Sequence, residues 1–290
     1  MTSVFTRPGK PTTFGRTPQP ALDKILRHEP SGRGVLVCLI GLAGTGKSSL
    51  LAQFPNCEFI VDKRDQGILD LMDYSETTGV NLPRSSVTVC DNYLNYKGTL
   101  EAAIEGPSDT IVLESLVGIQ SFCDDYTMSH DYDSASNPKA GNQFVNYRQG
   151  LILSANVHFQ ALIDLMIRGQ NSGKNIFLTG HSKIGSGKSV TSEDWVSQVL
   201  ENSPEIGRRV NASFATILHI GQSVATIKPA GKVRATGDIV YSIYTELNPY
   251  FPAKNRMGLH GEIEYPSSPQ EAYLVLCKAL KLDPNTGKRL

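Results

Sequence analysis

The feature that most constrains this chain is the segment G-L-A-G-T-G-K-S at residues 41–48, which follows the pattern G-x-x-x-x-G-K-S. It comes directly after the apolar run V-L-V-C-L-I at 35–40, which is typical of a parallel strand buried on both faces. Residues 47–54 can then begin a helix. This order predicts an anion site, because the N–H groups of the loop converge on phosphate oxygens and the helix dipole adds a favourable field.

The pattern assigns roles to individual side chains of this P-loop. Lys47 is expected to reach the β- and γ-phosphates of ATP, and the Ser48 hydroxyl is expected to hold Mg²⁺. The competing interpretation is a glycine-rich turn with an incidental lysine, which the flanking strand and helix disfavour. The residues expected to contact the nucleotide are Gly41, Leu42, Ala43, Gly44, Thr45, Gly46, Lys47, Ser48 and Ser49.

Composition limits the remaining possibilities. A chain of 290 residues predicts one large α/β domain, or one domain plus appendages, and the apolar fraction of 40% is enough for a substantial core. The formal net charge of zero means that any basic surface must be local. Five scattered cysteines without a C-x-x-C pair favour a reducing compartment. No stretch approaches the ~20 apolar residues of a membrane span, and no apolar signal segment is evident, so we expect a cytoplasmic protein without a membrane contact.

The chain is expected to divide at its N-terminal end. Residues 1–19 are rich in proline, glycine and basic residues, which predicts a flexible arm, or one that docks on a neighbouring subunit or touches phosphate. Residues 20–28 have the spacing of a short amphipathic helix. Residues 1–30 are therefore interpreted as an arm, and residues 31–290 as the folded domain.

Three further strands are expected to end in polar residues near the phosphates, since functional groups gather at the carboxyl ends of strands in such sheets. After the strand 57–62, either Asp62 or Asp65 could orient the water that attacks the γ-phosphate. The segment 109–115 has the Walker B shape, an apolar strand that ends in a carboxylate and a hydroxyl, and its Glu114 is a candidate for holding Mg²⁺. After the strand 176–179, His181 is a candidate sensor of the γ-phosphate. The alternative for Asp62 and Asp65 is a solvated turn, and the alternative for Glu114 is a carboxylate that only caps the strand end. The alternative for His181 is a hydrogen bond to a neighbouring loop.

Two basic segments are candidates for contact with nucleic acid. Residues 183–189 are interpreted as a mobile loop whose Lys183 and Lys188 touch a nucleic-acid backbone, or as a plain surface loop. Lys254 and Arg256 lie in a predicted loop at 252–258, and could reach a phosphate across a subunit boundary or on a nucleic-acid strand. Few aromatic residues occur in these segments, which favours backbone contact over base stacking.

The rest of the chain alternates between loops and regular elements. Residues 123–141 are polar and acidic, and we expect a solvated, partly mobile loop that fits no EF-hand pattern. Apolar spacing predicts one long helix over 143–168 and an amphipathic helix over 269–282. Antiparallel strands are expected at 214–220 and 223–228, with a turn at Gly221-Gln222, and another strand at 237–247.

The order of these features resembles the RecA-type recombinase core, and more closely the phage-encoded nucleotide-binding AAA-domain proteins related to single-strand-annealing RecA-like ATPases. Together the matching segments span about 35–260. They are the P-loop at 41–48, VDKRDQG at 61–67, TIVLES at 110–115, IFLTGHSK at 176–183 and AKNRMGL at 253–259.

The resemblance implies an α/β fold of the RecA-like P-loop NTPase type, with a mostly parallel central sheet flanked by helices. The strand ending at Thr179 would lie between the P-loop strand and the Walker B strand. It also implies oligomers with ATP at subunit interfaces, and single-stranded DNA as the partner. Asp65 stands where the family has a water-activating Glu, Glu114 replaces an Asp, and Asn255 replaces the Asp of A-K-D-R, which implies a slow ATPase or an ATP-dependent assembly switch.

The leading interpretation is therefore a Mg²⁺-dependent, RecA-like ATPase that acts on single-stranded DNA in recombination, annealing or replication. A small-molecule kinase is one alternative, although the arginine-rich lid usual in such enzymes is not evident after the P-loop. A regulatory protein that uses nucleotide only as a switch is the other. Turnover stimulated by DNA, turnover stimulated by a metabolite, and binding without turnover distinguish the three.

Overall fold

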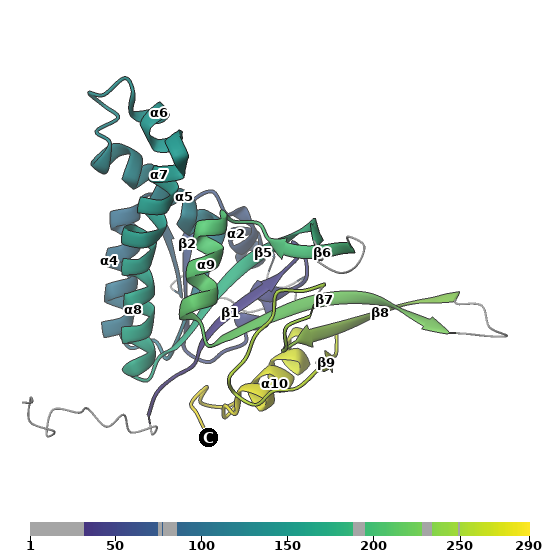
Figure 1. Ribbon diagram of the computed structural model, residues 1–290. Coiled ribbons are helices and arrows are strands. Elements are labelled where there is room, and N and C mark those ends of the chain that lie inside the picture. Colours follow the sequence, from purple (N-terminus) through teal and green to yellow (C-terminus); the bar gives the residue numbers. More distant parts are fainter. Residues whose placement is uncertain (1–31, 75–76, 78–85, 188–194, 228–233, 249) are drawn as a thin grey trace, which may run out of the picture. The chain divides into compact units, whose positions relative to one another are not determined.

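The computed structural model describes residues 32–74, 77, 86–187, 195–227, 234–248 and 250–290. The predicted arm at 1–30 and Lys188 lie outside these residues. Residues 32–290 contain a nine-stranded sheet with helices on both faces (Figure 1). The strands are β1 (Leu36–Gly41), β2 (Cys57–Asp62), β3 (Val87–Cys90), β4 (Thr110–Glu114), β5 (Asn175–Gly187), β6 (Trp195–Leu200), β7 (Thr216–Ile227), β8 (Arg234–Tyr244) and β9 (Glu262–Tyr265).

The sheet is parallel through the order β3-β2-β4-β5-β1-β7. Strands β8 and β9 continue it antiparallel, and β6 pairs antiparallel with the outer half of β5. This confirms the predicted fold class, a mostly parallel sheet with antiparallel strands toward the C-terminus. It also places β5 between β1 and β4, as the resemblance implied.

The helices cover the sheet as two layers with separate cores. Along β1, Leu36, Cys38 and Ile40 face a cluster with α4, α5, α8 and α9, whereas Val37 and Leu39 face a cluster with α1, α2 and α10. Burial on both faces explains the unbroken apolar run before the P-loop. The helices are α1 (Lys47–Leu51), α2 (Gln66–Asp73), α4 (Tyr93–Glu105), α5 (Leu116–Tyr126), α6 (Ala140–Val145), α7 (Gln149–Leu153), α8 (Gln160–Asn171), α9 (Pro204–Ser213) and α10 (Pro269–Leu280).

The prediction of one unbroken helix over 143–168 is wrong. Helix α6 ends at Val145, the chain turns through Tyr147 and Arg148, and α7 begins at Gln149 and continues through a π-helical segment, Ser154–Phe159, into α8. A Cβ on Gly150 would lie 2.2 Å from the Phe144 ring, so α6 and α7 pack too closely for a side chain there. Apolar spacing cannot reveal this reversal, because both sides of the turn keep a helical period.

The acidic segment 123–141 is more ordered than expected. Helix α5 runs to Tyr126 and is followed by a π-helical turn, Thr127–Asp131. Asp131 accepts contacts from the rings of His130 and His158 at 2.9 and 2.6 Å. The Ser154 hydroxyl donates to Asp124 at 2.5 Å. Carboxylates that looked solvated in the sequence are therefore bound by neighbouring helices.

Two other local predictions need correction. Strand β7 is continuous through Gly221 and Gln222, which pair with Ser242 and Tyr241 of β8. Gly221 is a glycine in mid-strand because a Cβ there would lie 2.8 Å from the Tyr244 ring. The predicted mobile loop beginning at Lys183 is instead, over its described residues, the outer half of β5, where Lys183 pairs with Val199 of β6.

The helical stretch Ala140–Asn171 bears on the predicted lack of a membrane span. In the part of the chain that the structure describes, it is the one stretch long and apolar enough to cross a membrane by length and composition, contrary to expectation. Half of its most apolar window is buried inside the fold. A core helix passes the same test, so this stretch is weak evidence for a membrane contact.

Candidate functional site

The P-loop connects the carboxyl end of β1 to α1. Gly44 and Gly46 adopt φ values of 79° and 80°, a left-handed conformation that glycine reaches at little cost. Gly41 packs so tightly that a Cβ would lie 2.5 Å from the Ile220 carbonyl oxygen of β7. The Thr45 hydroxyl donates to the Leu42 carbonyl at 2.8 Å, which closes the loop on itself. The glycines of the pattern are therefore required by the backbone path.

Lys47 is held inside this loop. The residue is 4% exposed, and its Nζ donates to the carbonyl oxygens of Gly41 and Leu42 at 3.1 and 2.9 Å. Burial lowers the pKa of the ammonium, and the nearby charges of Glu114 and Asp65 partly oppose this shift. Among the described residues Lys47 forms no ion pair, so its charge is bound only by neutral oxygens. Such an ammonium can transfer its hydrogen bonds to a phosphate.

Ser48 and Glu114 lie side by side, as a shared role in Mg²⁺ binding requires. The Ser48 hydroxyl donates to Glu114 Oε2 at 3.1 Å, and this contact joins α1 to the end of β4. Burial, and secondarily the charge of Asp65, raise the pKa of Glu114 to about 7, against the opposing effects of Thr179, Lys47 and Ser48. A dication beside this carboxylate would restore its negative charge.

These two oxygens fit Mg²⁺ rather than a metal held by protein alone. Within the described ranges, no group of three or more His, Cys, Asp or Glu side chains is placed to hold a metal ion. Mg²⁺ typically takes one or two protein oxygens and completes its octahedron with phosphate and water. Ser48 and Glu114 supply that smaller set.

Asp65 and His181 join this group around one pocket. Asp65 follows β2 and accepts a hydrogen bond from the Gly67 N–H at 3.0 Å, which caps α2. Burial and the charge of Lys47 lower the pKa of His181, whose buried Nδ1 has no partner among the described residues. The P-loop pocket has a volume of about 360 Å³ and is lined by Ala43, Gly44, Gly46, Lys47, Ser48, Ser49, Asp65, Gly67, Leu71, Glu114 and His181.

Asp62, the second candidate for orienting water, forms an ion pair with Arg64 instead. Its carboxylate pairs with the Arg64 guanidinium at 2.6 Å and also accepts the Arg64 backbone N–H. The Asp62 side chain is almost fully buried in this pair. Of the two carboxylates, Asp65 is therefore the one that lines the P-loop pocket.

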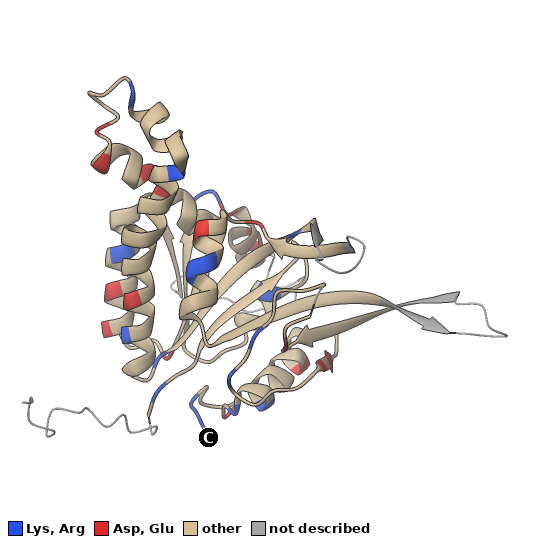
Figure 2. Cartoon of the chain, in the orientation of Figure 1, with Lys and Arg blue, Asp and Glu red and all other residues tan. Residues whose placement is uncertain are grey.

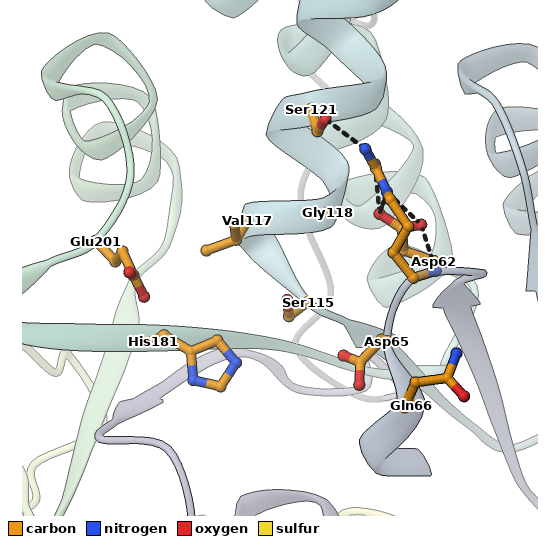
Figure 3. Close-up of a pocket in the computed structure, with 10 residues that line it drawn as sticks. Asp62, Asp65, Gln66, Ser115, Val117, Gly118, Ser121, His181 and Glu201 are labelled. Carbon is orange, nitrogen blue, oxygen red and sulfur yellow. Dashed lines mark hydrogen bonds and ion pairs between the residues drawn. The ribbon is translucent and has the colours of Figure 1, made fainter. Parts of the chain in front are cut away.

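A second pocket of about 440 Å³ adjoins the first and shares Asp65 and His181 with it. Figure 3 shows His181 and Glu201 on one side of this adjoining pocket and Asp65 and Gln66 on the other. The Glu201 N–H donates to the His181 carbonyl at 2.9 Å. Sequence reasoning missed Glu201, because only the return of the chain along β6 brings it to His181.

The basic residues predicted to act in trans lie elsewhere in the chain's fold. Lys254 pairs with Ile217 near the amino end of β7, and its Nζ donates to the Asn211 carbonyl at 2.6 Å. Arg256 is close enough for its charge to lower the pKa of Lys254, although burial is the larger cause. Both residues line a separate pocket of about 760 Å³. A single copy therefore does not bring them to the P-loop.

Asn255, which stands where the resemblance has an Asp, has a structural role. Its side-chain N–H groups donate to the carbonyls of Thr245 and Leu259 at 2.7 and 2.9 Å. Its Oδ1 accepts the N–H groups of Met257 and Leu259. An Asp cannot donate these two bonds, so the amide fits this loop better than a carboxylate.

The fold and the P-loop geometry define a P-loop NTPase. A family model described as the AAA domain matches residues 33–257, and the chain therefore belongs to this family of P-loop AAA-type ATPases. Membership supports nucleotide binding and hydrolysis, and proteins of the family generally use ATP and Mg²⁺. No curated protein matches the chain.

Proposed function

We propose that the protein is a Mg²⁺-dependent ATPase of the RecA-like, phage recombinase type, which binds ATP in the P-loop pocket and acts on single-stranded DNA. The observation that carries this proposal is the convergence of Lys47, the Ser48–Glu114 pair, Asp65 and His181 on one pocket. An ammonium, two adjacent metal-binding oxygens and a carboxylate that can orient a water molecule are the groups that phosphoryl transfer needs.

Each side chain then has one task. The Gly-rich loop and Lys47 bind the phosphates, and Ser48 and Glu114 hold the metal. When bound, Mg²⁺ would neutralise charge on the phosphate oxygens. Asp65 orients the attacking water. His181, which lies within β5 opposite Gly41 of β1, contacts the terminal phosphate and changes position with its loss. Asp65 is one methylene shorter than the Glu of the resembled family, which supports slow turnover.

We further propose that copies assemble head to tail, with the nucleotide at their boundary. The supporting observation is that opposite charges occupy different ends of the sheet. Asp65 lies just beyond the carboxyl end of β2, and Glu201 lies just beyond β6, beside His181 of β5. Lys254 and Arg256 lie instead near the amino end of β7. Lys254 or Arg256 of a neighbouring copy can then approach the phosphates, which within one copy are contacted by the basic side chain of Lys47.

Single-stranded DNA is proposed to contact the hairpin of β5 and β6. Lys183 is exposed on this hairpin, two residues beyond His181, so a change at the phosphate passes directly along one strand. Lys188 belongs to the same proposal and lies outside the described residues. Contact through lysines would be to the backbone and independent of sequence.

The test is ATP turnover with Mg²⁺, with and without single-stranded DNA. We expect turnover that DNA stimulates and that Lys47→Ala abolishes. The matched control is Lys97→Ala, which removes an exposed lysine of α4 paired with Glu101. Full activity of Lys47→Ala would refute the site, whereas normal turnover indifferent to DNA would refute only the DNA role.

One observation favours a second candidate, a small-molecule kinase. The adjoining pocket lies beside the P-loop pocket and offers the carboxylates of Asp65 and Glu201 to a second substrate. A hydroxyl or amine bound there would be placed to accept a phosphoryl group. Turnover stimulated by a panel of metabolites but not by DNA would select this candidate.

A further inference from the structure

A groove between α7 and α9 lies outside the three pockets described above. One wall is α7 with the π-helical segment that follows it, and the other is α9. Helix α9 packs on the side of the sheet opposite α1, and the groove shares no lining residue with the P-loop pocket. This α7–α9 groove has a volume of about 350 Å³ and is lined by Ile152, Asn156, Glu205, Arg208, Arg209 and Ala212.

Arg209 is a cation held in a fixed orientation, and it forms no ion pair with any residue that the structure describes. Its Nε and Nη2 both donate to Asn156 Oδ1, at 2.9 and 2.6 Å, and its Nη1 donates to Gln160 Oε1 at 3.3 Å. These acceptors are neutral amides, so they orient the guanidinium without cancelling its charge. A planar, pre-oriented guanidinium is suited to a phosphate, which it can bind through two parallel hydrogen bonds.

Two further arginines surround one buried carboxylate. Glu205 accepts hydrogen bonds from Arg148 at 2.6 Å and from Arg208 at 3.2 Å, and its side chain is 5% exposed. The Arg148 and Arg208 side chains are 49% and 72% exposed, so both keep faces open to solvent. The nearby Asp124 is hydrogen-bonded by Ser154 and Gln120, and burial raises its pKa. The groove therefore carries an excess of positive charge.

The turn before α7 holds an aromatic ring in solvent at an energetic cost. Tyr147 and Arg148 have φ values of 48° and 60°, a left-handed conformation that costs roughly 1–2 kcal/mol for each residue other than glycine. Tyr147 is 86% exposed, and within the described part of the chain its side chain makes no hydrogen bond or ring contact. Strain of this kind, maintained in two adjacent residues, is a feature of functional sites.

From these contacts we propose that the α7–α9 groove binds single-stranded nucleic acid, with backbone phosphates on Arg148, Arg208 and Arg209 and a base stacked on Tyr147. Tyr147 immediately precedes Arg148, whose guanidinium binds Glu205 of the groove. Cations combined with an exposed aromatic ring are the means by which proteins hold single strands without reading sequence. The inference rests on the proposed action on single-stranded DNA, and it adds a surface separate from the β5–β6 hairpin. Figure 2 shows basic positions on α9 and beside α7.

The experiment uses the full-length protein without nucleotide and a fluorescently labelled oligothymidine, with anisotropy measured over a salt series. Arg209→Gln is expected to weaken binding and to reduce the slope of log affinity against log salt by about 0.7, the value for one lost phosphate contact on a single strand. Tyr147→Ala is expected to weaken binding roughly five- to a hundredfold with an unchanged slope. The matched control is Arg168→Gln, an exposed arginine of α8 paired with Glu105.

Two variants separate binding from folding. Tyr147→Phe keeps the ring and is expected to bind as the wild type does. Tyr147→Gly is expected to raise the thermal midpoint, because glycine adopts this backbone without strain, and yet to bind as weakly as Tyr147→Ala. A higher midpoint together with weaker binding cannot come from a damaged fold.

Several results would overturn the proposal. If both Arg209→Gln and Tyr147→Ala bound oligothymidine with wild-type affinity, the groove would not be a binding surface for single strands. The proposed DNA role would still stand if Lys183→Ala weakened binding. Arg209-dependent binding of polyglutamate that is tighter than binding of oligothymidine would assign the groove to an acidic protein instead. If the wild-type protein bound no single strand, both this inference and the DNA role would fail while the ATPase assignment stood.

Discussion

The P-loop pocket and the α7–α9 groove both gather charged side chains, but they hold these charges in different ways. In the pocket, Lys47 and Glu114 are buried, and their pKa values move toward the neutral forms. In the groove, Arg148 and Arg208 remain largely open to solvent. Buried charges interact strongly and respond to protonation, whereas exposed ones interact weakly and are screened by salt. Substitutions should therefore have large, pH-dependent effects in the pocket and small, salt-dependent effects in the groove.

The largest expected effect comes from Lys47→Met. The apolar side chain removes the donor to the phosphates, and ATP turnover should fall about a thousandfold or more. The substitution leaves the Gly41 and Leu42 carbonyls without a donor, which lowers stability, but it also removes the desolvation cost of a buried ammonium, which raises stability. Because these two effects oppose each other, the fold should persist. Steady-state turnover and thermal unfolding measure the two effects, with Lys97→Met as the exposed control. A loss of folding equal to the loss of turnover would contradict this division.

Glu114 tests whether the pocket responds to protonation. Its folded-state pKa of about 7 lies above the value of 4.5 for an unperturbed carboxyl group. The folded protein therefore retains a proton that the unfolded chain releases, and stability present below pH 4.5 is progressively lost as the pH rises through 7. The loss should reach up to about 3 kcal/mol.

The measurement is denaturant unfolding without Mg²⁺ or nucleotide, just above pH 4.5 and again above pH 7. Glu114→Gln, which cannot ionise, should lose less stability over this interval than the wild type. If both proteins show the same pH dependence, the carboxylate is not protonated in the fold, and the contrast between pocket and groove weakens.

Asp65 and Asp62 offer a sharper test within a few residues of chain. Asp65→Asn should reduce the turnover rate about a hundredfold with little change in nucleotide affinity, because only the orientation of water is lost. Asp62→Asn should instead lower stability, since it leaves the Arg64 guanidinium without its buried partner. Single-turnover kinetics and unfolding distinguish the two. If Asp62→Asn lowered the turnover rate without lowering stability, Asp62 rather than Asp65 would be the residue that orients the water.

Local patterns in the sequence were sufficient to predict the core of the fold. The apolar run 35–40 predicts a strand buried on both faces, and the glycines of the P-loop predict a tight backbone path. Each prediction depends only on residues that are adjacent in the sequence. The same holds for Glu114, which ends an apolar strand. The order of strands, with β5 between β1 and β4, followed from the resemblance rather than from the residues.

The features that sequence reasoning missed depend on contacts between distant segments or on strain. Glu201 reaches His181 only because β6 returns along β5. The turn at Tyr147 and Arg148 interrupts a helical period with residues that usually avoid a left-handed backbone. Arg209 reads as an ordinary helix-surface residue until Asn156 is seen to bind it. Such features have no local signature.

The smallest expected effect comes from the β5–β6 hairpin and tests whether exposed charges act independently. Lys183→Ala with Lys188→Ala should weaken binding to oligothymidine and reduce the salt slope by about 1.4, or about 0.7 for each phosphate contact. Lys183 lies on β5 opposite Val199, whereas Arg209 is bound by Asn156 and Gln160, so the two cations share no partner among the described residues. Adding Arg209→Gln should therefore reduce the slope further by its own amount. Anisotropy over a salt series measures each step, and Lys183→Ala alone separates the two lysines. A combined variant no worse than either parent would mean that the strand uses only one of the two surfaces.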